Sequence, residues 1–448
     1  MTRPRVLIIA EAANPDWVSV PLIGWQLSRA LSSVADVHLV TQVRNRDAIL
    51  ATGLVEGVDF TAIDSEALSR PLWKLATILR RGEGKGWTTL QALNAISYPY
   101  FERLVWKRFG KAIKAGEYDV VHRVTPLSPT QSGVLARRCA RAGVPYIIGP
   151  LNGGVPWPRA FDAARRAERE WLSYVRGLYK VMPGHRGTLR HAAAVLTGSR
   201  HTAGELPEAL DPKVIWLPEN AIDPTRFASR PRSVTGPLRS CFIGRMVPYK
   251  GPDMLLEAAA PLLRNGRMHL DMIGDGPMLL GLREQAVALG ISEAITFHGW
   301  LAHSNVAGVA EKCSVLSFPS IREFGGGVVL EAMAMGLAPL IVDYAGPSEL
   351  VGPDTGFTIP LGSRTAIIRD LAAELERLTE NRGDVAATGA RARARVLAHF
   401  TWAAKAAQIA EVYDWVLGRR AEKPNFDHIA LMTTEPVDTE KEQRKAHV

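Results

Sequence analysis

The sequence is poor in cysteine and contains no long apolar run. Its three cysteines among 448 residues stand far apart, which argues against a disulfide framework and a structural zinc site and indicates a reducing compartment. No apolar run reaches the roughly 20 residues that a membrane-spanning helix needs. The first apolar segment, residues 6–10, is too short for a signal peptide and predicts a buried strand instead. We therefore expect a cytoplasmic protein.

Several nucleotide- and metal-binding motifs are also missing. There is no G-x-G-x-x-G after the first strand and no G-x-x-x-x-G-K-[ST]. The sequence therefore lacks the main motif that would indicate a dehydrogenase or a P-loop enzyme. There is no H-E-x-x-H and no cluster of cysteine and histidine, so the sequence requires no metal ion. The net charge of +9 is modest for this length, and no motif for nucleic-acid recognition accompanies it.

The sequence does contain a regular alternation of strands and helices. With 47% hydrophobic residues, it has ample material for buried cores. Strands are predicted at residues 6–10, 37–41, 120–122, 146–149, 240–243, 269–274, 295–298, 315–319 and 339–343. Helices are predicted at residues 22–32, 133–142, 252–263, 278–289, 328–335 and 402–417. This alternation predicts an α/β fold in which parallel sheets carry helices on both faces.

The chain divides into two such units. Residues 223–237 contain three prolines and predict a linker. We expect an N-terminal domain at residues 1–235, which includes most of this linker, and a C-terminal domain at residues 236–398. A final helix would occupy residues 399–418. Residues 419–448 are polar and charged, which predicts a disordered tail.

The loop at residues 244–251 carries the first candidate chemistry. Gly244 follows a predicted strand directly, and Arg245 and Lys250 stand five residues apart behind it. A planar guanidinium and a mobile ammonium together suit a diphosphate. The alternative is two solvated surface cations beside a turn, and the loop alone does not decide between the two interpretations.

Residues 323–336 carry the second candidate. Two carboxylates, Glu323 and Glu331, flank three glycines, and an apolar run follows the glycines. The glycines break a loop at a helix start, where free backbone amides attract an anion. One carboxylate would then reach a sugar hydroxyl and the other a ribose hydroxyl. The alternative is a flexible turn with Glu331 facing water, although the apolar neighbours of Glu331 argue against that orientation.

Taken together, these segments resemble the family-4 retaining glycosyltransferases of the GT-B fold. Six segments carry the resemblance in the family's order: a pre-linker segment at 216–223, G-R-x-x-x-x-K-G at 244–251, G-x-G-P at 274–277, F-x-G at 297–299, E-F-G-G-G-V-V-L-E at 323–331, which resembles the family's E-x-F-G-x-x-x-x-E, and F-[ST]-W at 400–402. Each motif is weak alone, but six in the right order are strong. The resemblance covers the C-terminal half well and the N-terminal half loosely.

The resemblance implies two Rossmann-like domains that face a cleft. The C-terminal domain would bind a nucleotide-diphosphate sugar, and the N-terminal domain would bind the acceptor. Arg245 and Lys250 would neutralise the diphosphate, Glu323 would bind the donor sugar, and Glu331 would bind the ribose. The other donor-binding residues would be Gly244, Phe324, Gly325, Gly326, Gly327 and Val328. The departing phosphate would accept the acceptor's proton, so neither a metal ion nor a resident cofactor would be required.

The N-terminal half departs from the family at two places. Members often carry a Gly-Gly loop after the first strand, where residues 11–17 of this chain contain no glycine. Asn152, Gly153 and Gly154 are an alternative approach to the donor, or else a plain turn. Members also carry an H-x-H-x-P run, of which only the first histidine, His122, is present. His122 is either a catalytic residue at the end of its strand or a structural histidine.

Two stretches of the N-terminal half are strongly basic. Lysine and arginine far outnumber acidic residues in residues 70–114 and 159–190, and aromatic residues are interleaved in the first stretch. Basic and aromatic segments can lie on anionic membranes, so we expect peripheral docking on the inner leaflet, near a lipid-linked acceptor. The alternative is a solvated helical face with the aromatic side chains in the core.

These features lead to one functional hypothesis with two alternatives. The leading hypothesis is a retaining glycosyltransferase that moves a sugar from a nucleotide-diphosphate sugar to a saccharide or lipid-linked saccharide, in cell-surface polysaccharide or glycolipid biosynthesis. A nucleotide-sugar epimerase of the same fold would instead need no acceptor. A non-catalytic donor-binding or scaffold subunit would bind the donor without turnover.

Overall fold

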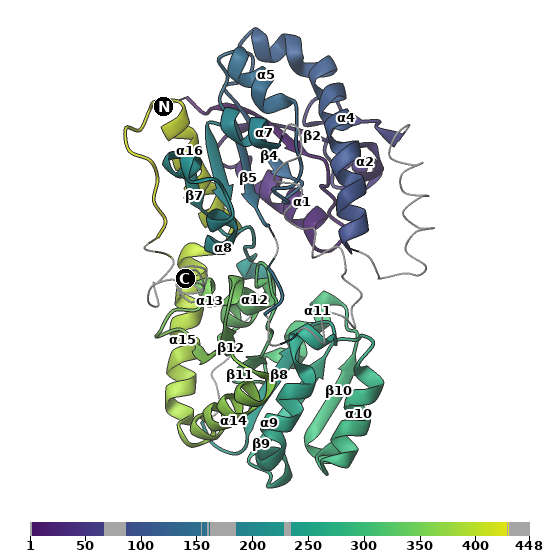
Figure 1. Cartoon of the computed structure of the whole chain (residues 1–448), viewed down its shortest axis with the longest axis vertical. Coiled ribbons are helices and arrows are strands. Elements are labelled where there is room, and N and C mark those ends of the chain that lie inside the picture. Colours follow the sequence, from purple (N-terminus) through teal and green to yellow (C-terminus); the bar gives the residue numbers. More distant parts are fainter. Residues whose placement is uncertain are drawn as a thin grey trace, which may run out of the picture.

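The structure contains two parallel sheets, one in each half of the chain. The computed structural model describes residues 2–66, 87–153, 155–158, 161, 185–227, 234–427 and 429, with the backbone alone at residues 87–96, 185, 303 and 304. Figure 1 shows the N-terminal half stacked above the C-terminal half. Each half is a sheet with flanking helices, so the predicted pair of Rossmann-like units is confirmed.

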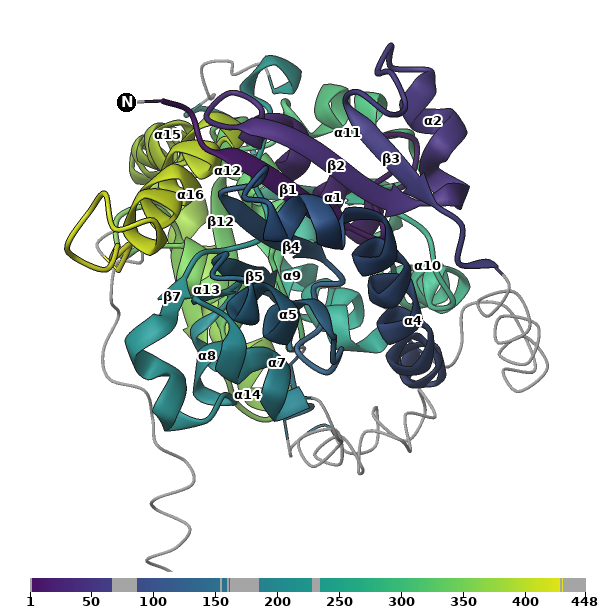
Figure 2. The ribbon, with the colours of Figure 1, turned by 90° about the horizontal axis from the view of Figure 1, so that it is seen from above.

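The first sheet has seven strands in the order β3-β2-β1-β4-β5-β6-β7, part of which can be followed from above in Figure 2. The strands are β1 (Arg5–Ala10), β2 (Asp36–Gln42), β3 (Phe60–Ile63), β4 (Val120–Thr125), β5 (Tyr146–Leu151), β6 (Ala194–Thr197) and β7 (Val214–Trp216). The helices are α1 (Val20–Leu31), α2 (Arg46–Leu50), α4 (Trp87–Lys114), α5 (Leu135–Arg141), α7 (His185–His191) and α8 (Arg200–Gly204). Strand β1 is buried on both faces: Leu7 and Ile9 join one apolar cluster, and Val6 and Ile8 join the other.

The second sheet has six strands in the order β10-β9-β8-β11-β12-β13. The strands are β8 (Leu238–Ile243), β9 (Met268–Ile273), β10 (Ile295–Gly299), β11 (Val315–Phe318), β12 (Ala338–Asp343) and β13 (Phe357–Pro360). The helices are α9 (Pro252–Arg264), α10 (Leu279–Ala288), α11 (His303–Ala310), α12 (Gly327–Ala334), α13 (Gly346–Leu350), α14 (Arg364–Glu380), α15 (Arg382–His399) and α16 (Trp402–Val416). Strands β8 and β11 are neighbours, so the loops that follow them leave the sheet at the same edge.

The predicted elements are present, but two strands of the first sheet are longer than expected. Strand β4 was predicted to end at His122 and instead continues to Thr125. It continues because Arg123 is fully buried, with its Nη1 donating to the Gln131 carbonyl at 2.9 Å and its guanidinium 5.4 Å from the Tyr98 ring. The contacts that bury Arg123 come from residues outside the strand, so the local pattern of the sequence did not contain them. Strand β5 likewise continues to Leu151.

The last helix returns to the first half of the chain. Ile222 and Thr401 form a parallel bridge just before α16, and α16 packs against α1. Figure 1 shows α15 beside the lower half and α16 beside the upper half. The two halves are therefore joined twice, by the segment near Ile222 and by the passage from α15 into α16.

The predicted disorder of residues 419–448 is wrong for the part that the structure describes. Phe426 and Ile429 are each only 4% exposed. Asp427 pairs with Arg200 at 2.8 Å, and the Lys423 ammonium donates to two carbonyls near β7. Two apolar side chains in a polar segment were enough to hold it against the protein. The rest of this segment lies outside the described residues.

No helix in the described part of the chain is both long and apolar enough to cross a bilayer. Helix α4 contains the aromatic residues of the first basic stretch that the structure describes. Tyr98, Phe101 and Phe109 are buried in the core, which agrees with the solvated-face alternative for this helix. Residues 67–86, and all of 159–184 except Phe161, lie outside the described residues.

Candidate functional site

The loop after β8 begins with a glycine that a side chain would obstruct. Gly244 has φ 150°, and a Cβ at this position would stand 3.3 Å from Lys250 Cδ and 3.4 Å from Lys250 Nζ. Glycine therefore lets the Lys250 side chain lie across the end of the strand. A 3-10 turn, Pro248–Lys250, delivers the lysine and ends at Gly251, which has φ 67°.

Lys250 contacts Glu323, the loop carboxylate predicted to bind the donor sugar. The ammonium Nζ is 2.9 Å from Glu323 Oε2, and the two side chains are only 16% and 20% exposed. The same ammonium lies 5.0 Å from the centre of the Phe318 ring. The structure thus brings together two residues that the sequence placed 73 positions apart, and the pair is shielded enough from water for its attraction to matter.

Arg245 lies on the same loop as Lys250 but differs in its surroundings. Its side chain is exposed and has no hydrogen-bond or ion-pair partner among the described residues. Its guanidinium is therefore available to an anion that reaches this edge of the sheet. The sequence alone left open whether both cations are ordinary surface charges, and Lys250 is not one.

The three glycines of the second loop lie against the end of the first half. A Cβ at Gly325 would stand 2.2 Å from both Asn220 Nδ2 and Glu219 Oε1. Gly326 has φ 57° and caps α12, which begins at Gly327. The amides of Gly327 and Val328 are in the first turn, where a helix has no internal acceptor for them. Phe324 and the glycines thus form the close approach between the two halves.

Glu331 lies one turn inside α12. It is half-buried, between the fully buried Leu330 and Ala332. This agrees with the expectation that its apolar neighbours keep it from facing open water. Its role in holding a ribose stays a prediction.

Asn152 and Gly153 approach this junction from the end of β5. Asn152 Nδ2 donates to Glu219 Oε1 at 2.5 Å, and the Gly153 amide donates to Thr202 Oγ1 at 3.0 Å. Asn152 therefore shares Glu219 with the glycine turn at Gly325. Gly154 lies outside the described residues.

The sequence analysis gave no role to Glu219, which is central to this junction. Glu219 is 2% exposed, and burial raises the pKa of its carboxyl. Lys405 of α16 is 1% exposed, and burial lowers the pKa of its ammonium to about 7, although the Glu219 charge opposes that shift. The signal that could have drawn attention to Glu219 is a carboxylate set between apolar residues just before the linker.

A second carboxylate joins the halves at the same level. Glu349 of α13 accepts from the Arg200 amide at 2.9 Å and from Trp216 Nε1 at 2.6 Å. Burial raises the pKa of Glu349 to about 7 against the opposing effect of these hydrogen bonds. Both donors belong to the first half, so Glu349 links α13 to the ends of β6 and β7.

His122 lies in the core, not at a strand end. It is fully buried within β4, with Nδ1 2.8 Å from Tyr413 Oη and Nε2 2.9 Å from the Gly149 carbonyl. Burial lowers the pKa of its imidazole to about 4. Both ring nitrogens are engaged, so the geometry is that of the structural alternative, tying α16 to the first sheet.

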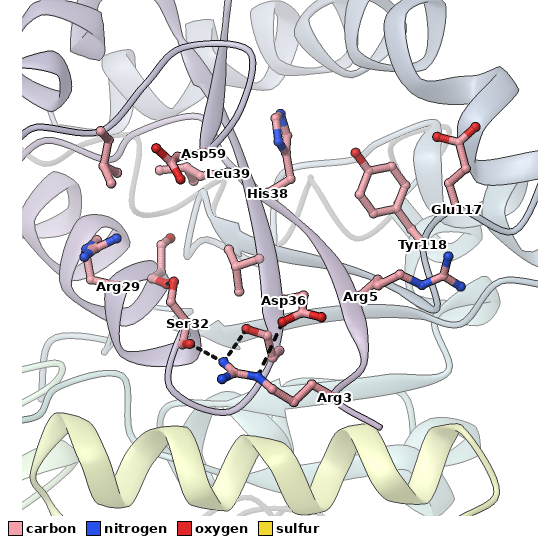
Figure 3. Close-up of a pocket in the computed structure, with 14 residues that line it drawn as sticks. Arg3, Arg5, Arg29, Ser32, Asp36, His38, Leu39, Asp59, Glu117 and Tyr118 are labelled. Carbon is pink, nitrogen blue, oxygen red and sulfur yellow. Dashed lines mark hydrogen bonds and ion pairs between the residues drawn. The ribbon is translucent and has the colours of Figure 1, made fainter. Parts of the chain in front are cut away.

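A pocket lies elsewhere, at the amino ends of β1 and β2 (Figure 3). Its volume is about 510 Å³, and Arg3, Arg5 and Asp36 are among its lining residues. The Arg3 and Arg5 guanidiniums are paired with Asp36 at 3.4 Å and Asp119 at 2.7 Å. The predicted donor loops instead follow the opposite, carboxyl ends of β8 and β11.

The chemistry that this site can perform depends on its fixed charges. Within the described residues, no group of three or more histidine, cysteine, aspartate or glutamate side chains could hold a metal ion. Lys250, Arg245 and the start of α12 supply positive potential at one sheet edge, where a dianionic group would be stabilised.

Comparisons with known proteins agree with this geometry. Residues 225–395 match the family model described as glycosyl transferases group 1. The D-inositol 3-phosphate glycosyltransferase of Nocardia farcinica is 35% identical over 184 residues, which cover 39% of this chain and 40% of that protein. The MMP alpha-(1->4)-mannosyltransferase of Mycolicibacterium hassiacum is 27% identical over 317 residues, or 69% of this chain and 73% of that protein. The chain thus spans less than half the length of the Nocardia relative.

Solved structures extend the likeness to both halves. HepE of Anabaena in complex with UDP superposes with a TM-score of 0.60 at 16% sequence identity, covering 91% of this chain and 99% of that chain. At this identity the likeness concerns the fold. Its coverage includes the N-terminal half, which lies outside the matched family model. Residues 225–395 thus resemble the glycosyl transferases group 1 family, and the two parallel sheets with their flanking helices have the GT-B fold.

Proposed function

We propose that the chain transfers a sugar from a nucleoside-diphosphate sugar to an acceptor hydroxyl. The observation that carries this proposal is the contact between Lys250 and Glu323 at the edge where β8 and β11 end. A cation and a carboxylate meet there, and α12 begins four residues after that carboxylate. These are the groups that a diphosphate joined to a sugar would need. HepE, the solved relative in fold, binds UDP.

Donor binding would change the partner of Lys250. In the free chain its ammonium is 2.9 Å from Glu323. A diphosphate carries more negative charge than one carboxylate, so it would attract the ammonium away from Glu323. Glu323 would then be free to accept hydrogen bonds from sugar hydroxyls. One exchange would fill both subsites, with the phosphates on Lys250 and the sugar on Glu323.

The remaining donor contacts are proposed from the positions of other residues near the same edge of the second sheet. The exposed Arg245 guanidinium would cover the outer phosphate oxygens, and the amides of Gly327 and Val328 would approach them from the start of α12. Glu331 would bind the ribose hydroxyls one turn further along the helix.

The reaction itself requires stabilisation of a leaving group. As the bond between the sugar and the diphosphate breaks, negative charge grows on the departing phosphate. Fixed cations aimed at that charge stabilise the transition state more than the ground state. The acceptor oxygen would form its bond to the anomeric carbon on the same face that the diphosphate leaves, and its proton would pass to the departing phosphate. The configuration would then be retained and no protein base would be needed.

The donor base and the acceptor are further proposals. HepE has been solved in complex with UDP and with UDP-glucose, and we propose a UDP-sugar as the first donor to test. The Nocardia relative is named for D-inositol 3-phosphate and the Mycolicibacterium relative for an alpha-(1->4)-mannosyl linkage. We propose a saccharide or lipid-linked saccharide acceptor, with residues 70–114 and 159–190 as the surface that would meet a membrane.

The experiment is a binding and turnover screen on the full chain. Thermal unfolding is followed with millimolar UDP, GDP and ADP, because a specific ligand raises apparent stability by mass action. The sugar donor that corresponds to the best nucleotide is then tested for nucleotide release with and without saccharide acceptors. Stabilisation by one nucleotide and acceptor-dependent release support the proposal. No stabilisation by any nucleotide would contradict it, and a changed sugar without an acceptor would indicate an epimerase.

A further inference from the structure

We propose that Arg322 is a positioning residue that latches the first half of the chain onto the donor loops. The inference rests on the proposed function, because it deepens the account of the same site. In the latched arrangement, residues 155–157 are held over the sheet edge where β8 and β11 end. Water is then kept from the donor sugar, and the acceptor side faces the donor.

The Arg322 guanidinium lies among three aromatic rings. Its central carbon is 5.3 Å from the Trp157 ring centre, 5.6 Å from that of Phe324 and 5.9 Å from that of Tyr249. The Trp157 and Tyr249 rings also meet edge to face at 5.9 Å and 90°. A guanidinium suits such a cage because its planar face attracts the electron-rich faces of the rings.

The cage is built from both halves of the protein. Trp157 follows β5 of the first sheet and is 7% exposed, whereas Tyr249, Arg322 and Phe324 follow β8 and β11 of the second. The buried tryptophan is thus covered in part by the other half. A contact of this kind holds the two halves together at one point of the junction.

Two hydrogen bonds reinforce the contact. Arg322 Nε donates to the Val155 carbonyl at 2.9 Å, and Tyr344 Oη donates to the Pro156 carbonyl at 3.2 Å. The consecutive residues Val155, Pro156 and Trp157 are therefore each held by a side chain of the second half. Backbone carbonyls are strong acceptors, so the two hydrogen bonds fix the backbone of this segment, while the ring contacts fix the Trp157 side chain.

The latch is adjacent to the groups that would hold the donor. Tyr249 precedes Lys250, and Arg322 and Phe324 flank Glu323 along the chain. The Tyr249 carbonyl also accepts from the Ile321 amide at 2.9 Å, which ties the two donor loops to each other. The cage therefore borders both loops, and it would orient residues 155–157 relative to the sugar, where small shifts of reacting groups have large effects on rate.

This arrangement predicts a specific fault when the latch is loosened. The nucleotide would still bind, because its proposed contacts belong to the second half. Water would reach the donor sugar more easily, because the first half would no longer be held over it. The ratio of donor hydrolysis to transfer would rise, which loss of fold stability alone would not cause.

The test uses two variants of the full chain and a matched control. Arg322→Lys keeps the charge but loses the planar face and the Nε donor, and Tyr344→Phe removes a single hydroxyl. The control is Arg283→Lys, because Arg283 lies 5.0 Å from the Phe297 ring within the second half alone. We expect the hydrolysis-to-transfer ratio to rise on the order of tenfold in Arg322→Lys, less in Tyr344→Phe, and not in the control. UDP affinity should stay within about twofold in all three.

A second measurement does not depend on activity. Small-angle scattering of the free chains should give a larger radius of gyration for Arg322→Lys than for the wild type and Arg283→Lys. The latch proposal is refuted if Arg322→Lys and Tyr344→Phe have the same radius of gyration as the control and, where transfer occurs, the same ratio of donor hydrolysis to transfer. If the wild type neither transfers nor hydrolyses any donor, the proposed function fails, and scattering alone decides the latch.

Discussion

The contact between Lys250 and Glu323 leads to opposite expectations for its two members. Lys250→Met removes the cation that would meet the diphosphate, so we expect weaker nucleotide binding and slower transfer. Glu323→Gln removes the anion that competes for Lys250, so we expect nucleotide binding to become tighter by a few fold. Transfer by Glu323→Gln should still fall, because a neutral amide holds sugar hydroxyls less strongly than a carboxylate.

The magnitude follows from the charges and their surroundings. Two unit charges about 4 Å apart attract by about 4 kcal/mol at an effective dielectric constant of about 20. In the free chain Lys250 already has a partner at 2.9 Å, so much of that energy is offset when a nucleotide binds. The transition state carries additional charge that Glu323 does not match. We therefore expect Lys250→Met to lower kcat by about 10²- to 10³-fold and to weaken UDP binding by only about tenfold.

The assay combines titration calorimetry with UDP and initial rates of UDP release with an acceptor. Lys312→Met serves as the control, because Lys312 is an exposed lysine at the amino end of β11, the far edge of the same sheet. The double variant Lys250→Met with Glu323→Gln should bind UDP about as well as Lys250→Met alone, since the competitor matters only while the lysine is present. Weaker UDP binding in Glu323→Gln, or unchanged binding in Lys250→Met, would refute the partner exchange.

Two further predictions concern stability at the junction. Gly325→Ala should lower the free energy of unfolding by about 1–3 kcal/mol, because its Cβ would stand 2.2 Å from Asn220 and Glu219. The control is Gly281→Ala in α10, where a Cβ meets open space. This variant should be neutral or stabilising in the same urea titration. Equal effects of the two alanines would count against the close approach. Burial lowers the pKa of Lys405 to about 7, so its ammonium has no effect on stability above its ordinary pKa of 10.5, where both states are neutral. As the pH falls from 10.5 to about 7, only the unfolded chain takes up the proton, and the free energy of unfolding decreases. The free energy of unfolding of Lys405→Met should therefore exceed that of the wild type by a few kcal/mol at pH 6, and the difference should vanish near pH 10.5. A difference that does not depend on pH would show that the ammonium is not its cause.

The local signals in the sequence predicted most strands of the two sheets and the cationic and glycine-rich loops, but not β3, β6, β7 and β13. Short apolar strands and amphipathic helices alternate along the chain, and the structure has them within a few residues of the predicted bounds. Gly244 and Gly326 adopt φ values of 150° and 57°, which is why glycine was a usable signal there. These features depend on neighbours in the chain, so a single sequence contains them.

Errors arose where partners are distant in the sequence. The sequence predicts that a strand ends at His122, but His122 is held by Tyr413, 291 positions away, and the strand continues through Arg123, whose guanidinium lies over the Tyr98 ring. The polar tail after α16 was expected to be free, yet Phe426 is buried. Burial and hydrogen bonding between remote residues leave no local pattern to read.

By itself, therefore, the sequence determined the α/β class, the two units, and the cationic and glycine-rich loops. Only the tertiary structure decided that Lys250 and Glu323 touch, that Glu219 and Lys405 are buried together, and that Arg322 lies among rings from both halves. The physical reason is that strand and turn preferences act over a few residues. Electrostatic and packing energies instead depend on distances that are set when the two sheets come together.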